Sequence, residues 1–415
     1  MKLSEELQWR GFVNQTTLAD ISDLDTKTWT FYFGVDPSAP SMTIGNLATA
    51  MMVRHFIDHG HKAILLVGGA TGLIGDPDGK AEERVQRPAE DVAADAQAIA
   101  AQYQTIFDGQ AFEMVDNYDW FKDMRYLQFL RDVGKHVPMR QMLSREFIKE
   151  RLGEGASGIS YAEFSYALIQ GYDFLHLMRE YGATLQLAGS DQWGNSIAGV
   201  ELIRRITGQD AHVLTAPLVV NKATGKKFGK SEDGAIWLNK SMTSVYKFYQ
   251  FWLNLEDEGV IDYMKIYTLL SQERIMQIEQ EFLADKRSRL AQKTLAYEVT
   301  KLVHGQERAD SVKRISEVLF GGGSYAELTP ADFEQLQNEL PYAEGQENNL
   351  LEIVAGSDLA GSKSEARRFL QSRAIYLNGQ QVEPGVETIQ PDQTVDGYAI
   401  IRRGKNQHVL YRLLS

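Results

Sequence analysis

The first half of the chain alternates between short strand-like runs and longer stretches whose apolar residues recur at helical spacing. The runs at 28–33, 63–67 and 184–188 are rich in aliphatic, aromatic or β-branched residues, and the second is apolar throughout. An entirely apolar run of that length is typical of a strand buried on both faces. Helical patterns occur at 46–58, 89–107, 161–177 and 192–207. Strands separated by helices indicate βαβ units, so we predict an α/β fold with a parallel sheet and ligands beyond the carboxyl ends of its strands.

The second half of the chain has a different pattern. Strand signals fade from about residue 243, and amphipathic helices dominate up to residue 320. Glycines at 321–323 interrupt this pattern, and the polar stretch 341–349 has the composition of a linker. The sequence therefore predicts an α/β domain over 1–222, a lysine-rich loop and helical domain over 223–325, a linker over 326–349 and a small domain over 350–415.

The composition narrows the possible chemistry. The chain has 415 residues, of which 43% are hydrophobic, and it has no cysteine. The absence of cysteine excludes disulfides, cysteine-ligated zinc, iron–sulfur clusters and thiol nucleophiles, and it fits a reducing cytosol. The N-terminus lacks an apolar signal core, and no apolar run in the first hundred residues is long enough to span a membrane. We therefore expect a soluble, cytoplasmic protein without a membrane partner.

The charge is unevenly distributed. The whole chain has a formal net charge of −13, which argues against a protein that coats nucleic acid nonspecifically. Residues 350–415 carry eight basic and seven acidic residues, a net charge of +1, so the other residues hold the remaining −14. A local basic surface in the last domain is therefore compatible with the acidic total.

Two glycine-containing segments follow predicted strands. Residues 34–46 offer backbone N–H groups and a helix N-terminus to an anion, although Ser41 or Thr43 could simply cap the helix. Residues 68–80 are rich in glycine, which lets a backbone approach a ligand closely, but an ordinary turn has the same composition. Neither a G-x-G-x-x-G pattern nor a P-loop can be drawn there, which disfavours dinucleotide enzymes and P-loop NTPases.

Three further segments carry candidate chemistry. The three lysines of residues 226–231 could neutralise a polyphosphate, or they could belong to a solvated turn. Tyr166, Gln170 and Asp173 share one face of the predicted helix over 161–177. Burying such a polar row is costly unless a polar ligand or other buried groups satisfy it, and a solvent-facing row is the alternative. Polar residues at 190–192 follow a predicted strand, where a ribose or an α-carboxylate could be held.

Taken together and in this order, these segments resemble a bacterial-type tyrosyl-tRNA synthetase, a class I aminoacyl-tRNA synthetase, over essentially the whole chain. The most specific motifs are Gly-Ser-Asp-Gln-Trp-Gly-Asn at 189–195, Asn-Tyr-Asp-Trp at 117–120 and the segment 69–77. Lys-Phe-Gly-Lys-Ser at 227–231 is similar to the second class I signature, commonly Lys-Met-Ser-Lys-Ser. Residues 362–379 resemble an S4-type RNA-binding module, with a basic helix followed by a strand and a turn.

The resemblance implies a Rossmann-like catalytic domain, an α-helical anticodon-binding domain and an S4-like α+β domain. It also implies the activity, in which tyrosine reacts with ATP to give tyrosyl adenylate and pyrophosphate, and the tyrosyl group passes to the 3′ end of tRNA(Tyr). The expected partners are tyrosine, ATP with Mg²⁺, tRNA(Tyr) and a second copy of the chain. No protein-bound metal or organic cofactor is expected.

The resemblance further implies a role for each matched residue, with Tyr32 and Asp173 on the substrate phenol. The full set expected around tyrosine is Tyr32, Asp76, Asn117, Tyr166, Gln170, Asp173 and Gln192. The set expected around ATP is Asp36, Ser38, Gly45, Thr49, Gly189, Asp191 and Lys230. The set expected to act on the phosphates is Thr43, Asn46, Lys80, Arg84, Lys227, Lys230 and Ser231. The set expected to contact RNA is Lys363, Arg367, Arg368 and Arg373.

The chain departs from the family pattern at the first class I signature. That signature usually reads His-Ile-Gly-His, and here residues 43–46 read Thr-Ile-Gly-Asn. The hydroxyl of Thr43 is shorter than an imidazole and neutral, so either activation is slower or Ser38, Ser41 or the lysine loop compensates. A smaller departure is Phe33, which stands where a smaller residue near the ribose is familiar.

Two alternatives remain at this point. One is the tryptophan enzyme of the same class, but its substrate has no hydroxyl for Tyr32 and Asp173 to bind. The other is a non-catalytic or weakly catalytic RNA-binding or splicing protein on the same scaffold, which the change at Thr43 favours.

Overall fold

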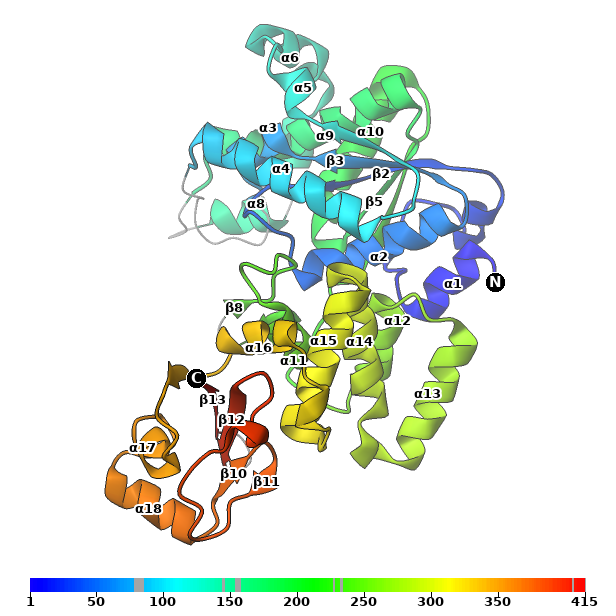
Figure 1. Ribbon diagram of the computed structural model, residues 1–415. Helices are drawn as coiled ribbons and strands as arrows, with labels where there is room; N and C mark the ends of the chain where they lie inside the picture. Colours follow the sequence, from blue (N-terminus) through cyan, green and yellow to red (C-terminus); the bar gives the residue numbers. More distant parts are fainter. Residues whose placement is uncertain are drawn as a thin grey trace. The chain divides into compact units, whose positions relative to one another are not determined.

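The computed structural model describes residues 1–77, 86–143, 146–153, 158–226, 228–231, 234–404 and 407–414 (Figure 1). The chain forms two compact units. The first contains Met1–Ser244 and Phe251–Val303, and the second contains Val245–Gln250 and His304–Ser415. No helix within the described ranges is both long enough and apolar enough to cross a membrane.

The first unit is built on a six-stranded sheet with the strand order β1-β6-β5-β2-β3-β4. Strands β2 to β6 pair in parallel, and the short β1 pairs antiparallel with β6. The strands are β1 (Gln15–Thr16), β2 (Thr30–Val35), β3 (Lys62–Val67), β4 (Phe112–Asp116), β5 (Leu185–Gly189) and β6 (His212–Ala216). The parallel pairing confirms the predicted α/β class, and β2, β3 and β5 cover the three predicted strands to within two residues at each end.

Helices pack on both faces of this sheet because side chains alternate along its strands. Tyr32 and Ile64 belong to a core cluster with residues of α9 and α10, whereas Phe31 packs against Phe56 of α2 with ring centroids 5.2 Å apart. The helices around the sheet are α2 (Ile44–Asp58), α3 (Gly69–Ile74), α4 (Ala89–Ile106), α5 (Tyr118–Phe121), α6 (Tyr126–Asp132), α7 (Met139–Leu143), α8 (Glu146–Arg151), α9 (Tyr161–Tyr181) and α10 (Trp193–Thr207).

Two local features of this unit were not predicted from the sequence. The glycine-rich segment after β3 is not only a turn, because residues Gly69–Ile74 form the short helix α3. Helices α9 and α10 approach closely where Gly171 faces Gly199, and a Cβ on Gly171 would lie 3.4 Å from the Gly199 nitrogen. Glycine at these positions lets the two helices pack backbone to backbone.

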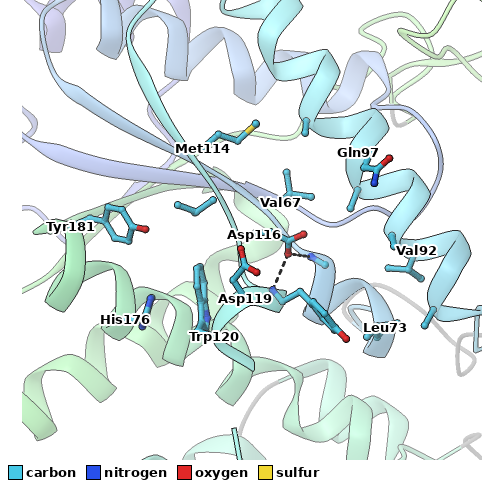
Figure 2. Close-up of a pocket in the computed structure, with 17 residues that line it drawn as sticks. Val67, Leu73, Val92, Gln97, Met114, Asp116, Asp119, Trp120, His176 and Tyr181 are labelled. Carbon is cyan, nitrogen blue, oxygen red and sulfur yellow. Dashed lines mark hydrogen bonds between the residues drawn. The ribbon is translucent and has the colours of Figure 1, made fainter. Parts of the chain in front are cut away.

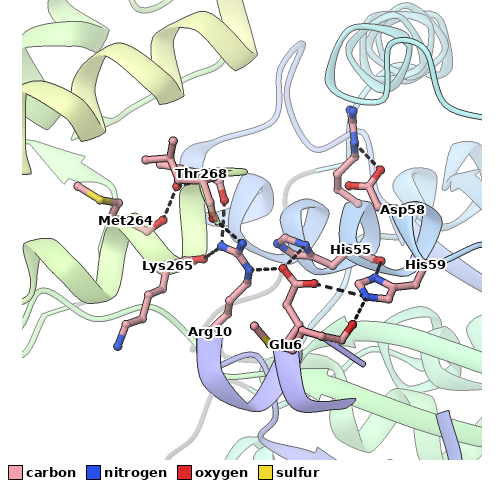
Figure 3. Close-up of polar contacts among 11 residues, drawn as sticks. Glu6, Arg10, His55, Asp58, His59, Met264, Lys265 and Thr268 are labelled. Atoms are coloured by element: carbon pink, nitrogen blue, oxygen red, sulfur yellow. Dashed lines mark hydrogen bonds and ion pairs between the residues drawn. The ribbon is translucent and has the colours of Figure 1, made fainter. Parts of the chain in front are cut away.

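A buried arginine ties the N-terminal helix α1 (Leu3–Arg10) to the end of α12 (Val260–Tyr267) (Figure 3). The Arg10 guanidinium donates to three carbonyl oxygens at 2.8–3.1 Å, those of Lys265, Thr268 and Leu270. Its Nε donates to Glu6 at 2.8 Å, and the same carboxylate lies 3.3 Å from Nδ1 of His55 on α2. These contacts hold α1, α2 and α12 together through one buried polar cluster.

Replacing His55 with glutamine should reduce the loss of stability in acid. Burial, together with the nearby charge of Arg10, lowers the pKa of His55 to about 3. The unfolded chain binds a proton on this histidine below about pH 6.5 and the folded protein does not, so the free energy of unfolding falls as the pH drops from about 6.5 towards 3. The expected contribution at about pH 5 is a loss of about 2 kcal/mol relative to neutral pH.

Urea unfolding of the wild type, His55→Gln and the control His136→Gln near pH 7.5 and pH 5 measures this difference. His136 serves as the control because its side chain is only partly buried. An equal loss of stability in His55→Gln and the wild type would contradict the assignment.

The remaining helices of the first unit are α12, α13 (Gln272–Ala284) and most of α14 (Leu290–His304), and α11 (Val245–Leu253) crosses the division between the units. The amphipathic helices predicted over 274–283 and 290–303 correspond to α13 and α14. A two-stranded sheet of β7 (Lys230–Ser231) and β8 (Gly234–Ala235) lies in the lysine-rich segment.

The second unit contains a five-stranded sheet with the order β11-β10-β12-β13-β9. Its strands are β9 (Tyr342–Gly345), β10 (Ile375–Leu377), β11 (Gln380–Gln381), β12 (Tyr398–Arg403) and β13 (Gln407–Leu413). Its helices are α15 (Gln306–Ser316), α16 (Pro330–Gln337), α17 (Leu350–Ala355) and α18 (Lys363–Gln371). The basic helix and following strand of the predicted small domain appear as α18 and β10.

The stretch 326–349, expected as a linker, contains regular structure. Helix α16 buries Phe333 and Leu336 in a cluster with Tyr398 and Leu410 of the sheet. Strand β9 pairs in parallel with β13 and forms the sheet edge. The polar composition of 341–349 concealed the strand because an edge strand with one solvated face needs few apolar residues.

Candidate active site

Helix α9 carries a buried carboxylate that two side chains from the segment after β4 bind. Asp173 is 2% exposed. Asn117 Nδ2 donates to its Oδ2 at 3.1 Å, and Trp120 Nε1 donates to its Oδ1 at 2.9 Å. Both donors belong to the Asn-Tyr-Asp-Trp motif of the sequence. The network therefore joins the carboxyl end of β4 to α9.

Two buried polar atoms of this region lack a hydrogen-bond partner within the described part of the chain. They are the hydroxyl of Tyr32, which is 2% exposed, and Oε1 of Gln170, one turn before Asp173 on α9. The ring of Tyr32 packs 5.1 Å from that of Phe174, centroid to centroid. Leaving a buried polar atom unpaired costs about 1–3 kcal/mol. Such atoms mark a place where a polar ligand would complete the network.

The protonation states in this region are set by burial. Burial raises the pKa of Asp173 to about 8, although Asn117 and Trp120 donate to it, and the charges of Asp36 and Asp116 act in the same direction as burial. Burial also raises the pKa of Tyr32 well above its ordinary value, with a contribution from the charge of Asp173. The carboxyl of Asp173 therefore holds a proton at neutral pH until a donor binds it.

A second carboxylate lies at the carboxyl end of β2. The Tyr166 hydroxyl donates to Asp36 Oδ2 at 2.6 Å, and the Thr71 hydroxyl donates to Asp36 Oδ1 at 2.6 Å. Asn117 Nδ2 donates to Thr71 Oγ1 at 3.0 Å, which links this carboxylate to the α9 network. A Cβ on Gly68 would lie 2.1 Å from Asp36 Oδ1, so a larger residue there would displace this carboxylate.

A third carboxylate follows α3. Gln192 Nε2 donates to Asp76 Oδ2 at 2.6 Å, and Asn195 Nδ2 donates to Oδ1 at 3.4 Å. Asn195 also donates to Gln192 Oε1 at 3.2 Å. This contact brings the glycine-rich segment next to the start of α10, so residues far apart in the sequence meet at the carboxyl edge of the parallel sheet.

Three of the residues expected around a ribose lie close together. A Cβ on Gly189 would lie 2.6 Å from Asp191 Oδ1 and 3.7 Å from Thr49 Oγ1. Thr49 is buried and Asp191 is exposed. Ser38 is exposed, and its backbone N–H donates to the Asp36 carbonyl at 2.8 Å.

The altered first signature forms a local cap at the start of α2. The backbone N–H and the hydroxyl of Thr43 each donate to Asn46 Oδ1 at 2.9 Å. A Cβ on Gly45 would lie 3.4 Å from the Thr43 hydroxyl. The two replaced positions of the signature, 43 and 46, therefore interact directly with each other.

The lysine-rich segment is anchored beside this cap. Phe228 is 5% exposed, and its ring stacks on Tyr263 at a centroid distance of 4.4 Å. Gly229 adopts φ +92°, and a Cβ there would lie 2.8 Å from Ile44 Cγ1, so the backbone passes close to the first signature. Ile44 N–H also donates to the Ile236 carbonyl at 3.1 Å.

The structure describes only part of the expected phosphate-binding set. Lys80, Arg84 and Lys227 lie outside the described residues. Lys230 and Ser231 contribute their backbone to β7, and their side chains are outside the description. The described Thr43 and Asn46 occupy the start of α2.

Three of the four residues expected to contact RNA take part in ion pairs. Lys363 binds Glu352 at 2.8 Å, Arg368 binds Glu365 at 3.2 Å, and Arg373 binds Glu383 at 2.5 Å. Arg367 is exposed on α18. Exposed ion pairs of this kind contribute little to stability and can exchange for phosphate contacts.

Several residues of the network were missed by sequence reasoning. Thr71, Trp120 and Asn195 stood inside the quoted motifs without an assigned role. Asp116 was missed as well, and it accepts hydrogen bonds from the N–H groups of Gly69 and Tyr118 at 3.1 and 2.8 Å. The signal available was the presence of polar side chains within glycine-rich or aromatic motifs at strand ends. No group of three or more histidine, aspartate or glutamate side chains suited to a metal ion occurs in the described ranges.

Comparison with known families covers nearly the whole chain. The family model described as tRNA synthetases class I (W and Y) matches residues 24–321. A second model, described as Tyrosine--tRNA ligase SYY-like C-terminal domain, matches residues 332–411.

Individual relatives agree with these matches. The chain is 46% identical over 422 residues to the Tyrosine--tRNA ligase of Geobacillus stearothermophilus, covering 99% of this chain and 100% of the relative. It is 43% identical to that of Streptococcus uberis, covering 99% of each. Its fold is similar to that of a C-terminally truncated mitochondrial tyrosyl-tRNA synthetase of Aspergillus nidulans, with a TM-score of 0.70, 30% identity, and coverage of 77% of this chain and 94% of that one.

Proposed function

Because the chain belongs to the tRNA synthetases of class I (W and Y), and its activity is that of a tyrosine–tRNA ligase, we propose that the amino-acid substrate binds between Tyr32 and Asp173. The reaction joins tyrosine to ATP as tyrosyl adenylate with release of pyrophosphate, and then transfers the tyrosyl group to the 3′ end of tRNA(Tyr). The single observation that carries the proposed site is the buried hydroxyl of Tyr32, which has no hydrogen-bond partner among the described residues, beside the buried carboxyl of Asp173.

The proposed pocket recognises the phenol hydroxyl of the substrate both as a hydrogen-bond donor and as an acceptor. The substrate hydroxyl would accept from Tyr32 and donate to Asp173, whose remaining interactions with Asn117 and Trp120 already fix its orientation. A phenylalanine side chain would leave these buried groups unpaired, which is the costly outcome. This arrangement also disfavours tryptophan, which has no hydroxyl to offer.

The proposed site for the substrate ammonium group consists of Asp76, Tyr166 and Gln170. Gln170 Oε1 is a buried acceptor without a partner among the described residues, which suits an N–H donor. Asp76 supplies a carboxylate positioned by Gln192 and Asn195. Gln192 would then lie beside the reacting carboxylate.

We propose that ATP binds along the carboxyl edge of the sheet with Mg²⁺ as part of the nucleotide substrate. The ribose would lie near Asp36, Thr49, Gly189 and Asp191, and the phosphates near the start of α2. Lys80, Arg84, Lys227, Lys230 and Ser231 would neutralise charge that develops on pyrophosphate as the tyrosine carboxylate attacks the α-phosphorus in line. The tRNA terminal hydroxyl would then attack the adenylate carbonyl carbon, displacing AMP.

The pair Thr43 and Asn46 is proposed to act as one unit in this activation step. Tyrosine-dependent ATP–pyrophosphate exchange by the wild type is the experiment that tests the proposed function, and no exchange would favour the non-catalytic alternative. The relatives and the polar pocket do not favour that alternative. We expect Thr43→His alone to slow exchange about tenfold, because it removes the hydroxyl hydrogen bond to Asn46 at the start of α2, which is worth about 1 kcal/mol.

The double variant Thr43→His/Asn46→His, which rebuilds the common signature, should recover most of the lost rate. The double-mutant cycle would then be strongly non-additive, as expected for residues in direct contact. Additive effects of the two substitutions would contradict the proposed unit.

The last domain is proposed to bind tRNA(Tyr) through α18 and neighbouring basic residues, with Lys363, Arg367, Arg368 and Arg373 on phosphates. The proposal is supported by the local charge of +1 over residues 350–415 in an otherwise acidic chain. We retain the boundaries of a catalytic domain over 1–222 and a helical domain over 223–325 as part of this proposal.

We further propose that the enzyme is a cytoplasmic homodimer. Large apolar side chains between α6 and the start of α9 are 42–77% exposed, and two of them touch through their hydroxyls at 3.4 Å. They are Tyr126, Leu127, Met139, Leu143, Leu152 and Tyr161. An exposed group of this kind is typical of an interaction surface.

A further inference from the structure

A cavity of about 720 Å³ in the first unit is lined by residues of α3, α4, β4, α5 and the C-terminal half of α9 (Figure 2). Its volume falls within the range of roughly 300–1,000 Å³ that is usual for small-molecule sites. None of the residues assigned above to tyrosine, ATP or tRNA lines it. The cavity is therefore a separate feature whose use the ligase reaction does not explain.

The walls of the cavity suit a flat apolar ring. One wall consists of small side chains on α4, including Ala93 and Ala96, which leave space beside the helix. Figure 2 shows Trp120 and His176 on the opposite side, and their rings stack with centroids 4.4 Å apart. Met114 is 41% exposed at the same cavity, so apolar surface remains uncovered there.

The polar groups of the cavity suit a cation. Asp116 and Asp119 lie among its lining residues, and the described residues that line it include no lysine or arginine. Asp119 pairs with Lys122 at 2.8 Å, whereas the hydrogen bonds that Asp116 accepts from described residues come from backbone N–H groups (Figure 2). Burial raises the pKa of Asp116 and lowers that of His176, so the histidine is neutral and the carboxylate is poorly solvated. A ligand ammonium group would offset that lost solvation.

We propose that this cavity binds a small aromatic ammonium compound, with its ring between α4 and Trp120 and its charge at Asp116, and that its binding strengthens tyrosine binding. The second part rests on the proposed role of Asp173 in holding the tyrosine phenol. The first part depends only on the cavity.

One hydrogen bond and one charge effect connect the cavity to the tyrosine pocket. Trp120 lines the cavity with its ring and donates to Asp173 Oδ1 at 2.9 Å. The negative charge of Asp116 also contributes to the raised pKa of Asp173. A cation at Asp116 offsets that charge and favours the ionised Asp173, which is the better acceptor for a phenol. Linkage then requires tyrosine to strengthen binding of the amine by the same factor.

Binding is tested by calorimetric titration of the full-length protein with tryptamine, and with indole-3-propionate as the anion of similar shape. Tryptamine should bind with a stoichiometry of one per chain, and the anion at least about tenfold more weakly. Ala93→Trp, which places a large side chain in the cavity from an exposed position, should weaken the binding of tryptamine about tenfold or more. Ala94→Trp is the matched control, because Ala94 is an exposed neighbour on α4 that does not line the cavity.

The charge contribution is tested by Asp116→Asn, with Asp123→Asn as the exposed control outside the cavity. Only Asp116→Asn should weaken the binding of tryptamine. Absence of saturable binding up to about 10 mM, or unchanged binding by Ala93→Trp, would overturn the site. Because tyrosine-dependent exchange is measured separately, such a failure would leave the proposed function standing.

Coupling is tested by titrating tyrosine with and without saturating tryptamine. Tyrosine should bind about fivefold more tightly in its presence, and this gain should vanish in Ala93→Trp. Weaker tyrosine binding would identify tryptamine as a competitor in the tyrosine pocket and overturn the proposal. Unchanged tyrosine affinity with tryptamine bound would refute the coupling.

Discussion

Replacing Asp173 with alanine should cost the enzyme most of its discrimination between tyrosine and phenylalanine. Tyrosine enzymes of this class reject phenylalanine by a factor of about 10⁵, a value already established for them. The physical origin proposed for this chain is the buried carboxyl that accepts from the substrate hydroxyl, opposite Tyr32, whose hydroxyl has no partner in the described ranges. Without the carboxyl, the ratio of kcat/KM values should fall to roughly 10², because tyrosine loses its acceptor and phenylalanine no longer leaves one unpaired.

Tyrosine- and phenylalanine-dependent pyrophosphate exchange, measured over a range of each amino acid, checks this ratio. Asp173→Asn is the conservative companion, since it keeps the volume and one carbonyl acceptor for Trp120. Asp132→Ala removes an exposed carboxylate on α6 and should leave the ratio unchanged. Kinetics of Asp173→Ala that match the wild type for both amino acids would remove Asp173 from the site.

The sheet was predictable because its strands are marked by strong local patterns. Residues 63–67 are all apolar, so their side chains leave water only if both faces of the strand are covered. This run forms β3 at an interior position of the sheet. The edge strand β4 was not predicted, because its sequence Phe-Glu-Met-Val-Asp is half polar and its second and third residues are exposed. The edge strand β9 was hidden in the same way, since an edge position allows one solvated face.

The many glycines after β3 gave no indication that a helix forms there. Residues 69–74 include Gly69 and Gly72, which are poor helix formers, and yet they form α3. A Cβ at Gly69 would lie 2.4 Å from Asp116 Oδ1, and one at Gly72 would lie 2.9 Å from Pro37. The segment packs closely against the ends of β4 and β2, and this packing favours glycine at both positions despite its low helix propensity. A single sequence does not reveal such long-range contacts.

The sequence was enough to nominate residues for the candidate site, but it was not enough to predict their mutual contacts. The spacing of Tyr166, Gln170 and Asp173 fixes one helix face, and the structure confirms that all three lie on α9. Pairings such as Asp36 with Thr71 cross 35 positions of sequence, and Asp76 with Gln192 crosses 116. Only the order of the strands in the sheet decides which of these side chains meet.

Replacing Lys230 with alanine should slow tyrosine activation about 10²–10³-fold while changing the dissociation constant of tyrosine by less than about threefold. The neighbouring backbone supports this location for the lysine. Gly229 passes close enough to Ile44 to exclude a Cβ, and the backbone of Lys230 in β7 pairs with that of Ala235 in β8. The loop is thus held beside the start of α2, where the phosphates are proposed to bind. A lysine there would contribute most when charge develops on the leaving pyrophosphate, so its removal should lower kcat.

Pre-steady-state measurement of adenylate formation, with equilibrium binding of tyrosine on the same preparations, separates these two effects. Lys240→Ala is the matched control, because Lys240 is an exposed lysine ten residues further along and is expected to change neither quantity. If Lys230→Ala weakened tyrosine binding by the same factor as it slowed activation, the lysine would act on the ground state as much as on the transition state. The loop would then be a substrate-binding element, and the proposed neutralisation of pyrophosphate would have to come from other residues.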